Sequence, residues 1–262
     1  MSIVFSAITP HPPLLIPTIG KENLARLRVT ENSFKKLEED LYSSKAETIF
    51  IISPHGSFLP SSFSINLSPE YYANFEEFGD FATKQKYSGN IGLAHKIRES
   101  METTVPLQLV SSSEIDHGIS VPLFLLTAHL PKIKIIPAYY SGLNLTAHFQ
   151  FGQNLKKELI ASKERIAVIA SGDLSHKLSK NSPAGYFPKA GRFDKKIIKY
   201  LTEKKVKEIL KFKDDYLKEV SECGLRSIVV LLGIMEGINC EPRILSYEAP
   251  FGVGYLTMNY KL

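Results

Sequence analysis

Tryptophan is absent from this 262-residue chain, and cysteine occurs only twice, as Cys223 and Cys240. Two cysteines cannot build the disulfide framework of a small secreted domain, and so few of them suit a reducing compartment. The sequence also lacks any apolar run near the roughly 18 residues that a membrane-spanning helix needs, and no basic and apolar leader precedes its first strand. We therefore expect a cytoplasmic protein with no membrane partner.

The chain likewise lacks a concentrated patch of one charge. Its 32 lysines and arginines against 27 acidic residues give a net charge of +5. The lysines occur in pairs that are spread along the chain with acidic residues nearby: Lys35-Lys36, Lys156-Lys157, Lys195-Lys196 and Lys204-Lys205. Proteins that bind nucleic acids usually cluster their basic residues and interleave them with aromatic ones. The charge therefore argues against a nucleic-acid partner and favours, at most, an anionic small molecule.

What the sequence does contain is an alternation of short apolar runs, typical of buried strands, with amphipathic segments, typical of helices. We predict strands at Ile3–Ile8, Thr48–Ile52, Phe63–Leu67 (at a sheet edge), Leu107–Val110, Ile133–Ala138 and Ile166–Ala170. We predict helices around Leu27–Leu41, Asn90–Met101, Val121–Ala128 (with Pro122 in its first turn), Thr146–Ser162, Phe193–Leu201, Val206–Phe212 and Leu225–Leu232.

This order of elements indicates an α/β fold, and no shift in composition marks a domain boundary. We expect a single three-layer αβα domain over residues 1–262 with a twisted, mostly parallel or mixed sheet. Arg243–Glu248 and Gly254–Tyr260 flank a Pro-Phe-Gly turn and should form an antiparallel C-terminal edge.

Four of the predicted strands are each followed by a histidine. Ile166–Ala170 runs into Ser171-Gly172-Asp173-Leu174-Ser175-His176, and the other three strands run into loops that contain His11, His55 and Asp116-His117. Open α/β sheets place their chemistry at the carboxyl ends of the strands. We therefore expect four imidazoles to converge on one rim of the sheet.

Two of these histidines are suited to metal binding. His11 lies between prolines, which hold its loop rigid, and His55 lies between Pro54 and Gly56. Two histidines and one carboxylate form a triad that leaves positions open on Fe(II). Glu222, just before an apolar helix, is the first candidate for the carboxylate, and Glu248 is the second. Cys223 is a third candidate, and its thiolate would favour zinc or copper(I).

Each of these positions also has a structural explanation. His11 could be an ordinary turn residue, Glu222 could cap the helix that follows it, and Asp116 and Asp173 could only shape turns or cap helices. Three further histidines, His95, His129 and His148, fall on predicted helices and are expected to be structural or to face solvent.

Two further segments bear on the rim. An aromatic-rich segment, Tyr71–Phe81, is either a satellite hydrophobic cluster or the wall of a cleft. The loop Lys177–Gly191 is rich in glycine and proline and could cover the rim.

The motifs follow one another as they do in a known family. They are Thr9-Pro10-His11-Pro12-Pro13, Ser53-Pro54-His55-Gly56, Asp116-His117-Gly118, Ser171-Gly172-Asp173-Leu174-Ser175-His176, Glu222-Cys223-Gly224-Leu225-Arg226-Ser227 and Tyr247-Glu248-Ala249-Pro250-Phe251-Gly252-Val253-Gly254-Tyr255. Together they resemble the catalytic β-subunit-like domain of class III extradiol ring-cleavage dioxygenases over nearly the whole chain. The resemblance is closest to the Memo-like branch found in AmmeMemoRadiSam systems.

The resemblance implies a non-haem Fe(II) centre held by His11, His55 and a later carboxylate, with His176 as catalytic base and His117 as its partner. The implied substrates are a catechol and O2, and a homo-oligomer is compatible with the family. Memo-like relatives carry a cysteine at the third-ligand position, where this chain has Glu222 next to Cys223. The alternative function is therefore a metal- or small-ligand-binding protein without ring cleavage, which works with Ammecr-type and radical-SAM partner proteins.

Overall fold

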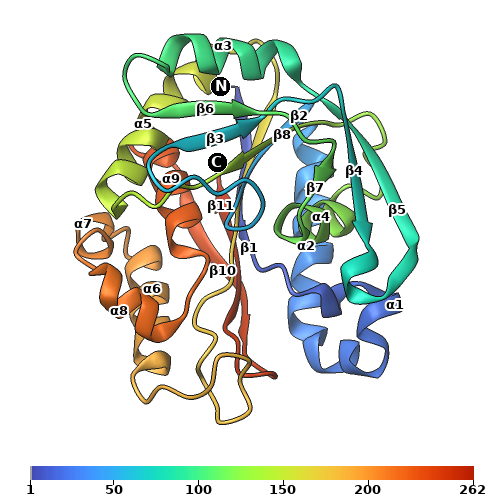
Figure 1. Cartoon of the computed structure of the whole chain (residues 1–262), viewed down its shortest axis with the longest axis vertical. Helices are drawn as coiled ribbons and strands as arrows, with labels where there is room; N and C mark the ends of the chain where they lie inside the picture. The colour runs from blue at the N-terminus through green and yellow to red at the C-terminus, as the bar shows by residue number, and fades with distance from the viewer. Residues whose placement is uncertain (1) are drawn as a thin grey trace.

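The computed structural model describes residues 2–262 and alternates strands with helices (Figure 1). The strands are β1 (Ile3–Thr9), β2 (Thr48–Ser53), β3 (Phe63–Asn66), β4 (Glu70–Phe75), β5 (Asp80–Gly89), β6 (Leu107–Val110), β7 (Glu114–Ile115), β8 (Lys134–Tyr139), β9 (Ile166–Ser171), β10 (Glu241–Glu248) and β11 (Tyr255–Lys261). The α-helices are α1 (Pro17–Gly20), α2 (Arg28–Ser44), α3 (Ile91–Met101), α4 (His117–Leu126), α5 (Leu145–Ala161), α6 (Ala190–Thr202), α7 (Val206–Ile209), α8 (Asp214–Val220) and α9 (Leu225–Met235). Short 3-10 helices cover Pro13–Leu15, Lys21–Leu27 and Glu76–Phe78.

Within the described residues, the strands form one eleven-stranded mixed sheet. Its main path runs β10-β11-β1-β9-β2-β8-β5-β4-β7, and β3 pairs with both β8 and β6 beside that path. The centre, β1-β9-β2-β8, is parallel, whereas the β10–β11 hairpin joins β1 in antiparallel orientation. The predicted α/β class and the antiparallel C-terminal edge are therefore confirmed.

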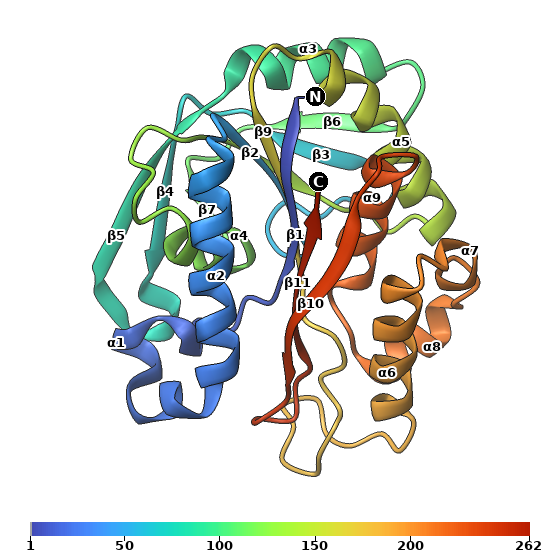
Figure 2. The ribbon, with the colours of Figure 1, turned by 180° about the vertical axis from the view of Figure 1, so that it is seen from behind.

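The central strands bury both of their faces because successive side chains point to opposite sides. On β2, Phe50 and Ile52 join the core that contains α5 and α9, whereas Ile49 and Ile51 join the core that contains α2 and α4. Figures 1 and 2 show these helix pairs on opposite sides of the central strands. The sheet is thus the middle layer of three.

Several boundaries differ from those predicted. Strand β3 is paired on both sides, because β6 covers the edge that the sequence left open. Helix α4 begins at His117 rather than near Val121, so Pro122 lies inside the helix. The helix predicted from Val206 is only the short α7, and α8 follows it as a separate helix. His129 lies in a turn after α4 and is exposed, not on a helix.

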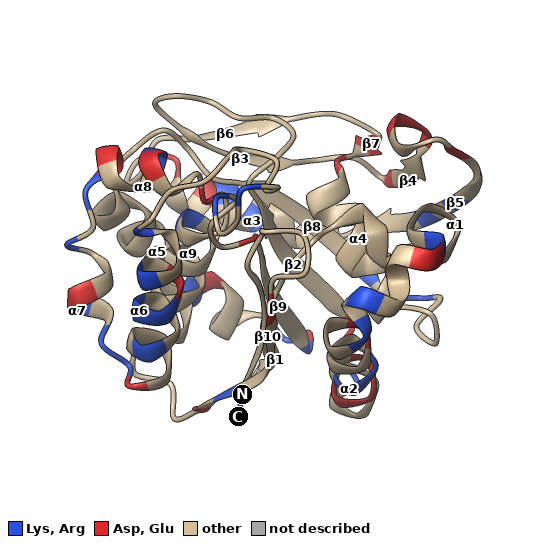
Figure 3. Ribbon diagram, turned by 90° about the horizontal axis from the view of Figure 1, so that it is seen from below, with Lys and Arg blue, Asp and Glu red and all other residues tan. Residues whose placement is uncertain are grey.

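Charged residues are distributed over the outer helices. Figure 3 marks both acidic and basic residues along α2 and basic residues along α6. On α2, Lys36 pairs with Asp40 one turn away. Among the described residues, no helix is both long enough and apolar enough to cross a membrane.

The buried histidine of α5, His148, has a structural role. Its Nδ1–H donates to the Asn144 carbonyl at 2.8 Å, and its Nε2 accepts from the backbone N–H of Ser141 at 3.3 Å. Burial lowers the pKa of His148 to about 4, because the charged ring would lose its hydration. Protonation of Nε2 would also break the bond to Ser141.

This histidine should make the fold sensitive to acid. Since the unfolded chain takes up the proton near pH 6.5 and the folded chain only near pH 4, the stability that neutral His148 provides is lost as pH falls through that window. We expect His148→Gln to reduce the fall in unfolding free energy between pH 7 and pH 4 by about 3 kcal/mol. Urea unfolding of the metal-free protein measures this. His129→Gln, at an exposed site, is the control; equal pH slopes for both variants would refute the assignment.

Candidate functional site

The candidate site lies where the parallel strands β1, β9 and β2 end. Thr9 is in register with Ser171, and Ile52 is in register with Ala170, so the three strands end side by side. The loops that follow them carry His11, His176 and His55. Because parallel strands share one direction, these loops must leave from the same edge of the sheet.

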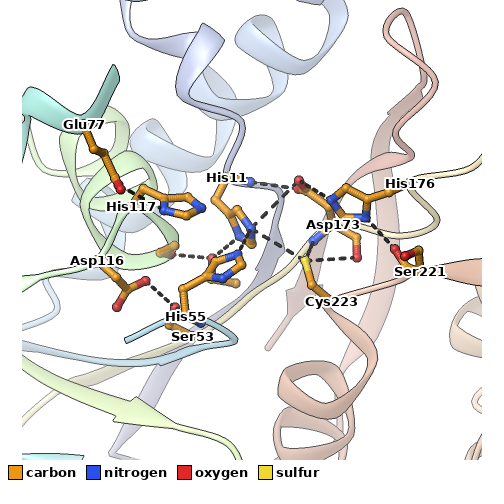
Figure 4. A network of polar contacts seen from close by, with 12 residues as sticks. His11, Ser53, His55, Glu77, Asp116, His117, Asp173, His176, Ser221 and Cys223 are labelled. Carbon is orange, nitrogen blue, oxygen red and sulfur yellow. Dashed lines mark hydrogen bonds and ion pairs between the residues drawn. The ribbon is translucent and has the colours of Figure 1, made fainter. Parts of the chain in front are cut away.

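Four imidazoles meet at this edge (Figure 4). The Nε2 atoms of His11 and His55 lie 3.2 Å apart. The ring of His117 stacks on that of His55, with centroids 4.3 Å apart, and meets the ring of His11 at 5.4 Å. His176 lies on the other side of the pair in Figure 4, beyond Asp173. The structure therefore brings together the four histidines that follow strands.

Cys223 joins this group from the turn between α8 and α9. Its Sγ lies 3.7 Å from His11 Nε2, and the ligand atoms of His11, His55 and Cys223 all lie within 4.8 Å of one another. The turn comes close because Gly172 and Gly224 pack backbone against backbone; a Cβ on Gly172 would lie 2.1 Å from the Gly224 Cα. The backbone N–H of Gly224 also donates to the Asp173 carbonyl at 2.9 Å.

Neither Glu222 nor Glu248 belongs to the group. Glu222 Oε2 accepts the backbone N–H of Leu225 at 2.6 Å, at the start of α9, and burial raises the pKa of this carboxyl to about 7. Glu248 Oε1 accepts the backbone N–H of Thr30 at 2.7 Å, near the start of α2. Both carboxylates therefore accept backbone N–H groups in the first turn of a helix. This is the structural role that the sequence suggested for Glu222.

Asp173 lies in the middle of the site. Its Oδ1 accepts the backbone N–H of His11 at 3.0 Å, whereas its Oδ2 lies 3.9 Å from His11 Nε2 and 3.8 Å from His176 Nε2. Burial raises the pKa of Asp173 to about 6, and the neighbouring His176 opposes that rise. Of the turn acids, this one reaches the imidazoles directly.

Asp116 is placed differently. Its Oδ1 accepts the Ser53 hydroxyl at 2.6 Å, and the same hydroxyl accepts the backbone N–H of His55 at 3.1 Å. Burial raises the pKa of Asp116 to about 6. Asp116 therefore supports the loop of His55 through Ser53.

The donor atoms at the site fit a transition-metal ion. Burial lowers the pKa of His11 well below its usual value and that of His55 to about 4, so both imidazoles are neutral at pH 7 and have lone pairs to offer. Burial raises the pKa of the Cys223 thiol, which must lose its proton when it binds a metal. Two imidazoles and a thiolate, with Asp173 beside them, suit Fe(II), zinc or copper(I) rather than magnesium or calcium.

A chain of hydrogen bonds sets the orientation of His11. Pro122 has no N–H, so the carbonyl of Gly118, one turn earlier in α4, lacks its usual helical donor. The Ser171 hydroxyl donates to that carbonyl. Its oxygen, 2.9 Å from His11 Nδ1, is then left to accept the Nδ1–H. His11 is thereby held in the tautomer that presents the Nε2 lone pair to His55 and Cys223.

We expect Ser171→Ala to weaken metal binding about 10- to 100-fold, as loss of a hydrogen bond behind a metal-binding histidine usually does. Without the hydroxyl, His11 is free to take the other tautomer and to turn. Competition with a chelator of known affinity measures the change. The control is Ser6→Ala on β1, because the Ser6 hydroxyl is equally buried but has no hydrogen-bond partner among residues 2–262. Unchanged affinity in Ser171→Ala would contradict the role of this bond.

Four residues that support the site were not sequence candidates. Ser53 and Ser171 are the last residues of β2 and β9. A hydroxyl residue at the end of a buried strand is a sequence signal that could have identified both serines. Glu77 lies 3.3 Å from His117 Nδ1 but comes from the distant β4–β5 hairpin. Ser221 acts through its backbone carbonyl, which any residue has, so no side-chain pattern could have shown it.

The structure shows where the aromatic-rich segment and the glycine- and proline-rich loop lie. The Tyr71–Phe81 segment forms most of the β4–β5 hairpin: Tyr71 and Phe75 are core residues, while Phe78 sets its ring edge-on to His117, 5.3 Å away. The loop Lys177–Gly191 is tied to the tip of the β10–β11 hairpin through Gly252, and α6 begins within it at Ala190.

A cavity of about 410 Å³ opens beside the imidazoles and is lined by His55, His117, Asn74, Glu77 and Asp116 among others. A larger cavity, of about 700 Å³, has a mostly apolar lining that includes Phe149, Leu232 and Tyr260, and none of the histidines lines it. Chemistry rather than size therefore identifies the site.

Comparisons with known proteins were made for the whole chain. A family model described as the catalytic LigB subunit of aromatic ring-opening dioxygenase matches residues 6–258. Protein CA_C1420 of Clostridium acetobutylicum is 32% identical over 268 residues, which cover 98% of this chain but 57% of that protein. The chain thus spans little more than half the length of this relative.

Two more distant matches are informative. The 4,5-DOPA dioxygenase extradiol of Beta vulgaris is 27% identical over 183 residues, 66% of each protein. The crystal structure of the uncharacterized protein JW3007 from Escherichia coli K12 matches with a TM-score of 0.69 and 17% identity, over 98% of this chain and 99% of that one. At this identity, the structural match shows a shared fold.

Proposed function

The chain belongs to the family of the catalytic LigB subunit of aromatic ring-opening dioxygenases, and we propose that it is an Fe(II)-dependent extradiol dioxygenase that opens a catechol ring with O2. One observation carries the proposal: His11 and His55 direct their Nε2 atoms toward each other at 3.2 Å, with one further imidazole on each side, His117 and His176 (Figure 4). Such an arrangement combines a metal-binding pair with groups that can move protons.

His11, His55 and Cys223 would hold the metal. Their ligand atoms come from three separate loops and lie within 4.8 Å of one another. When bound, an Fe(II) ion supplies a Lewis acid for the catechol oxygens and reactivity toward O2. The protein's part is to keep the imidazoles neutral and oriented, which burial and the Ser171 hydroxyl accomplish.

We assign the role of general base to His176. Its Nδ1 lies 2.7 Å from the backbone carbonyl of Ser221, and a carbonyl can only accept, so Nδ1 carries the hydrogen. The Nε2 lone pair then faces the site and can take a proton from a catechol hydroxyl. Asp173 Oδ2, 3.8 Å away, is placed to stabilise the imidazolium that forms.

We assign a second proton transfer to His117. Its ring is held by the stacked His55 ring and by the edge of Phe78, and Glu77 lies beside Nδ1 at 3.3 Å. Burial lowers its pKa, so the ring is neutral at pH 7 and can hydrogen-bond to a substrate oxygen. The two assigned proton carriers thus act from opposite sides of the metal-binding pair.

One observation favours a second function. A thiol, rather than a carboxylate, completes the group with His11 and His55. Thiolate ligands suit zinc and copper(I), which do not perform the Fe(II) reaction with O2 and a catechol. The second candidate is therefore a metal- or small-ligand-binding protein that has lost ring cleavage and works with Ammecr-type and radical-SAM partners.

Anaerobic reconstitution with Fe(II) separates the two functions. We expect the loaded protein to show a spectral change with a catechol before air is admitted, and then to consume O2 as a ring-opened product forms. His95→Gln, at an exposed position of α3, should behave as the wild type. Stoichiometric iron without any response to a panel of catechols, in either condition, would reject the dioxygenase and leave the binding protein.

A further inference from the structure

We propose that Asp173, His176 and Cys223 form a second metal site beside the first, with the Cys223 thiolate shared between the two. The site itself rests on geometry alone. Its expected effect, inhibition through capture of His176, rests on the proposed dioxygenase function.

The three side chains have the spacing of metal ligands. One ligand atom from each lies within 4.8 Å of the other two. The distance from Asp173 Oδ2 to His176 Nε2 is 3.8 Å. A tetrahedral ion with bonds of about 2.1 Å to nitrogen or oxygen and about 2.3 Å to sulfur separates its ligand atoms by about 3.4 to 3.6 Å. The Asp173–His176 distance is only slightly wider than this, and the two distances to Cys223 Sγ are at most 4.8 Å, so side-chain adjustments would close the site.

Two of the three ligand side chains, His176 and Asp173, are also oriented by a hydrogen bond on the side away from the site. The backbone carbonyl of Ser221 accepts the Nδ1–H of His176, so the Nε2 lone pair points toward Asp173. The backbone N–H of His11 donates to Oδ1 of Asp173, and this places Oδ2 between His11 and His176. Such supporting bonds usually accompany metal-binding side chains. Figure 4 shows Asp173 and Cys223 between His11 and His176.

The donor chemistry identifies the class of ion. A thiolate, an imidazole and a carboxylate together suit Zn²⁺, which accepts all three donor types. Hard ions such as Mg²⁺ and Ca²⁺ prefer oxygen ligands and would not gain from Cys223. A thiolate has several lone pairs and can bridge two ions, so Cys223 can serve both sites.

Occupation of this site has a chemical consequence. The Nε2 lone pair of His176 that would take a proton from the substrate would instead bind the ion. His176 could then no longer act as a base, while His11 and His55 would still hold the first metal. Zinc added to the protein that already holds one equivalent of Fe(II) should therefore inhibit turnover.

Titration of the metal-free protein with Zn²⁺, in the presence of a chelator of known affinity, tests the site without catechol or O2. We expect two equivalents in the wild type. Asp173→Asn should bind the second equivalent at least about 10-fold more weakly, as should His176→Ala, and both should keep the first. Asparagine can still accept the His11 N–H through Oδ1, so this variant removes the ligand while preserving the backbone contact. The control is Asp194→Asn, because Asp194 is equally buried but bonds to Ser175 and Tyr247 outside the group.

Cobalt(II) substitution tests the shared thiolate. In the wild type, thiolate-to-cobalt absorption should change again with the second equivalent, and it should stop changing after the first equivalent in Asp173→Asn. A single equivalent in the wild type would overturn the proposal, as would a second equivalent that both variants retain. If the dioxygenase function fails but two zinc ions bind in this pattern, the second site stands and only its inhibitory role is lost.

Discussion

Replacement of His176 with alanine should lower turnover about 10²- to 10⁴-fold while the protein keeps its Fe(II). The reason is that Nε2 of His176, with Nδ1–H fixed on the Ser221 carbonyl, would remove a proton that must leave the catechol during the reaction. The loss should therefore appear mainly in kcat, with little change in KM or in metal content. Steady-state oxygen uptake, together with iron analysis of the same samples, measures all three.

Added imidazole provides the internal control for this variant. If the missing group is a base, a small imidazole that diffuses into the space left by the ring should restore part of the turnover. It should restore none in a variant that has lost its metal. A His176→Ala protein that keeps wild-type kcat, or one that loses its iron, would refute the assignment of His176 as the base.

Replacement of His11 or His55 with alanine should abolish stoichiometric metal binding and, with it, turnover. Their Nε2 atoms lie 3.2 Å apart at the centre of the group, and a site with three protein ligands cannot lose one and hold Fe(II) tightly. Metal analysis after equilibrium dialysis measures the effect. Retention of a full equivalent in both variants would show that the metal binds elsewhere.

Glu222 and Cys223 are adjacent, and replacing each of them with alanine tests which one is the third metal ligand. We expect Cys223→Ala to weaken metal binding strongly, because its Sγ lies 3.7 Å from His11 Nε2. Glu222→Ala should leave the metal in place and lower the unfolding free energy by about 1 kcal/mol, since it removes the acceptor at the start of α9. The opposite pattern would show that the third ligand is Glu222, the first candidate from the sequence.

The sequence by itself determined the parallel centre of the sheet and the edge at which the chemistry lies. The apolar runs of β1, β2 and β9 indicate strands buried on both faces, and such strands, alternating with helices along the chain, are typical of a parallel sheet between two helical layers. Once they run parallel, His11, His55 and His176 have to emerge at one edge. This inference needs only local composition and the shared direction of the strands.

Only the tertiary structure decided which of two adjacent residues in the turn before α9 reaches the histidines. Glu222 and Cys223 are adjacent, and their side chains leave the backbone in different directions. The choice between them depends on the contact between Gly172 and Gly224, which are 52 positions apart and which pack closely because neither has a side chain. Likewise, Glu77 meets His117 only because the β4–β5 hairpin folds over α4. Contacts between distant segments leave no periodic signal in the sequence, because they depend on how the layers pack rather than on any local pattern.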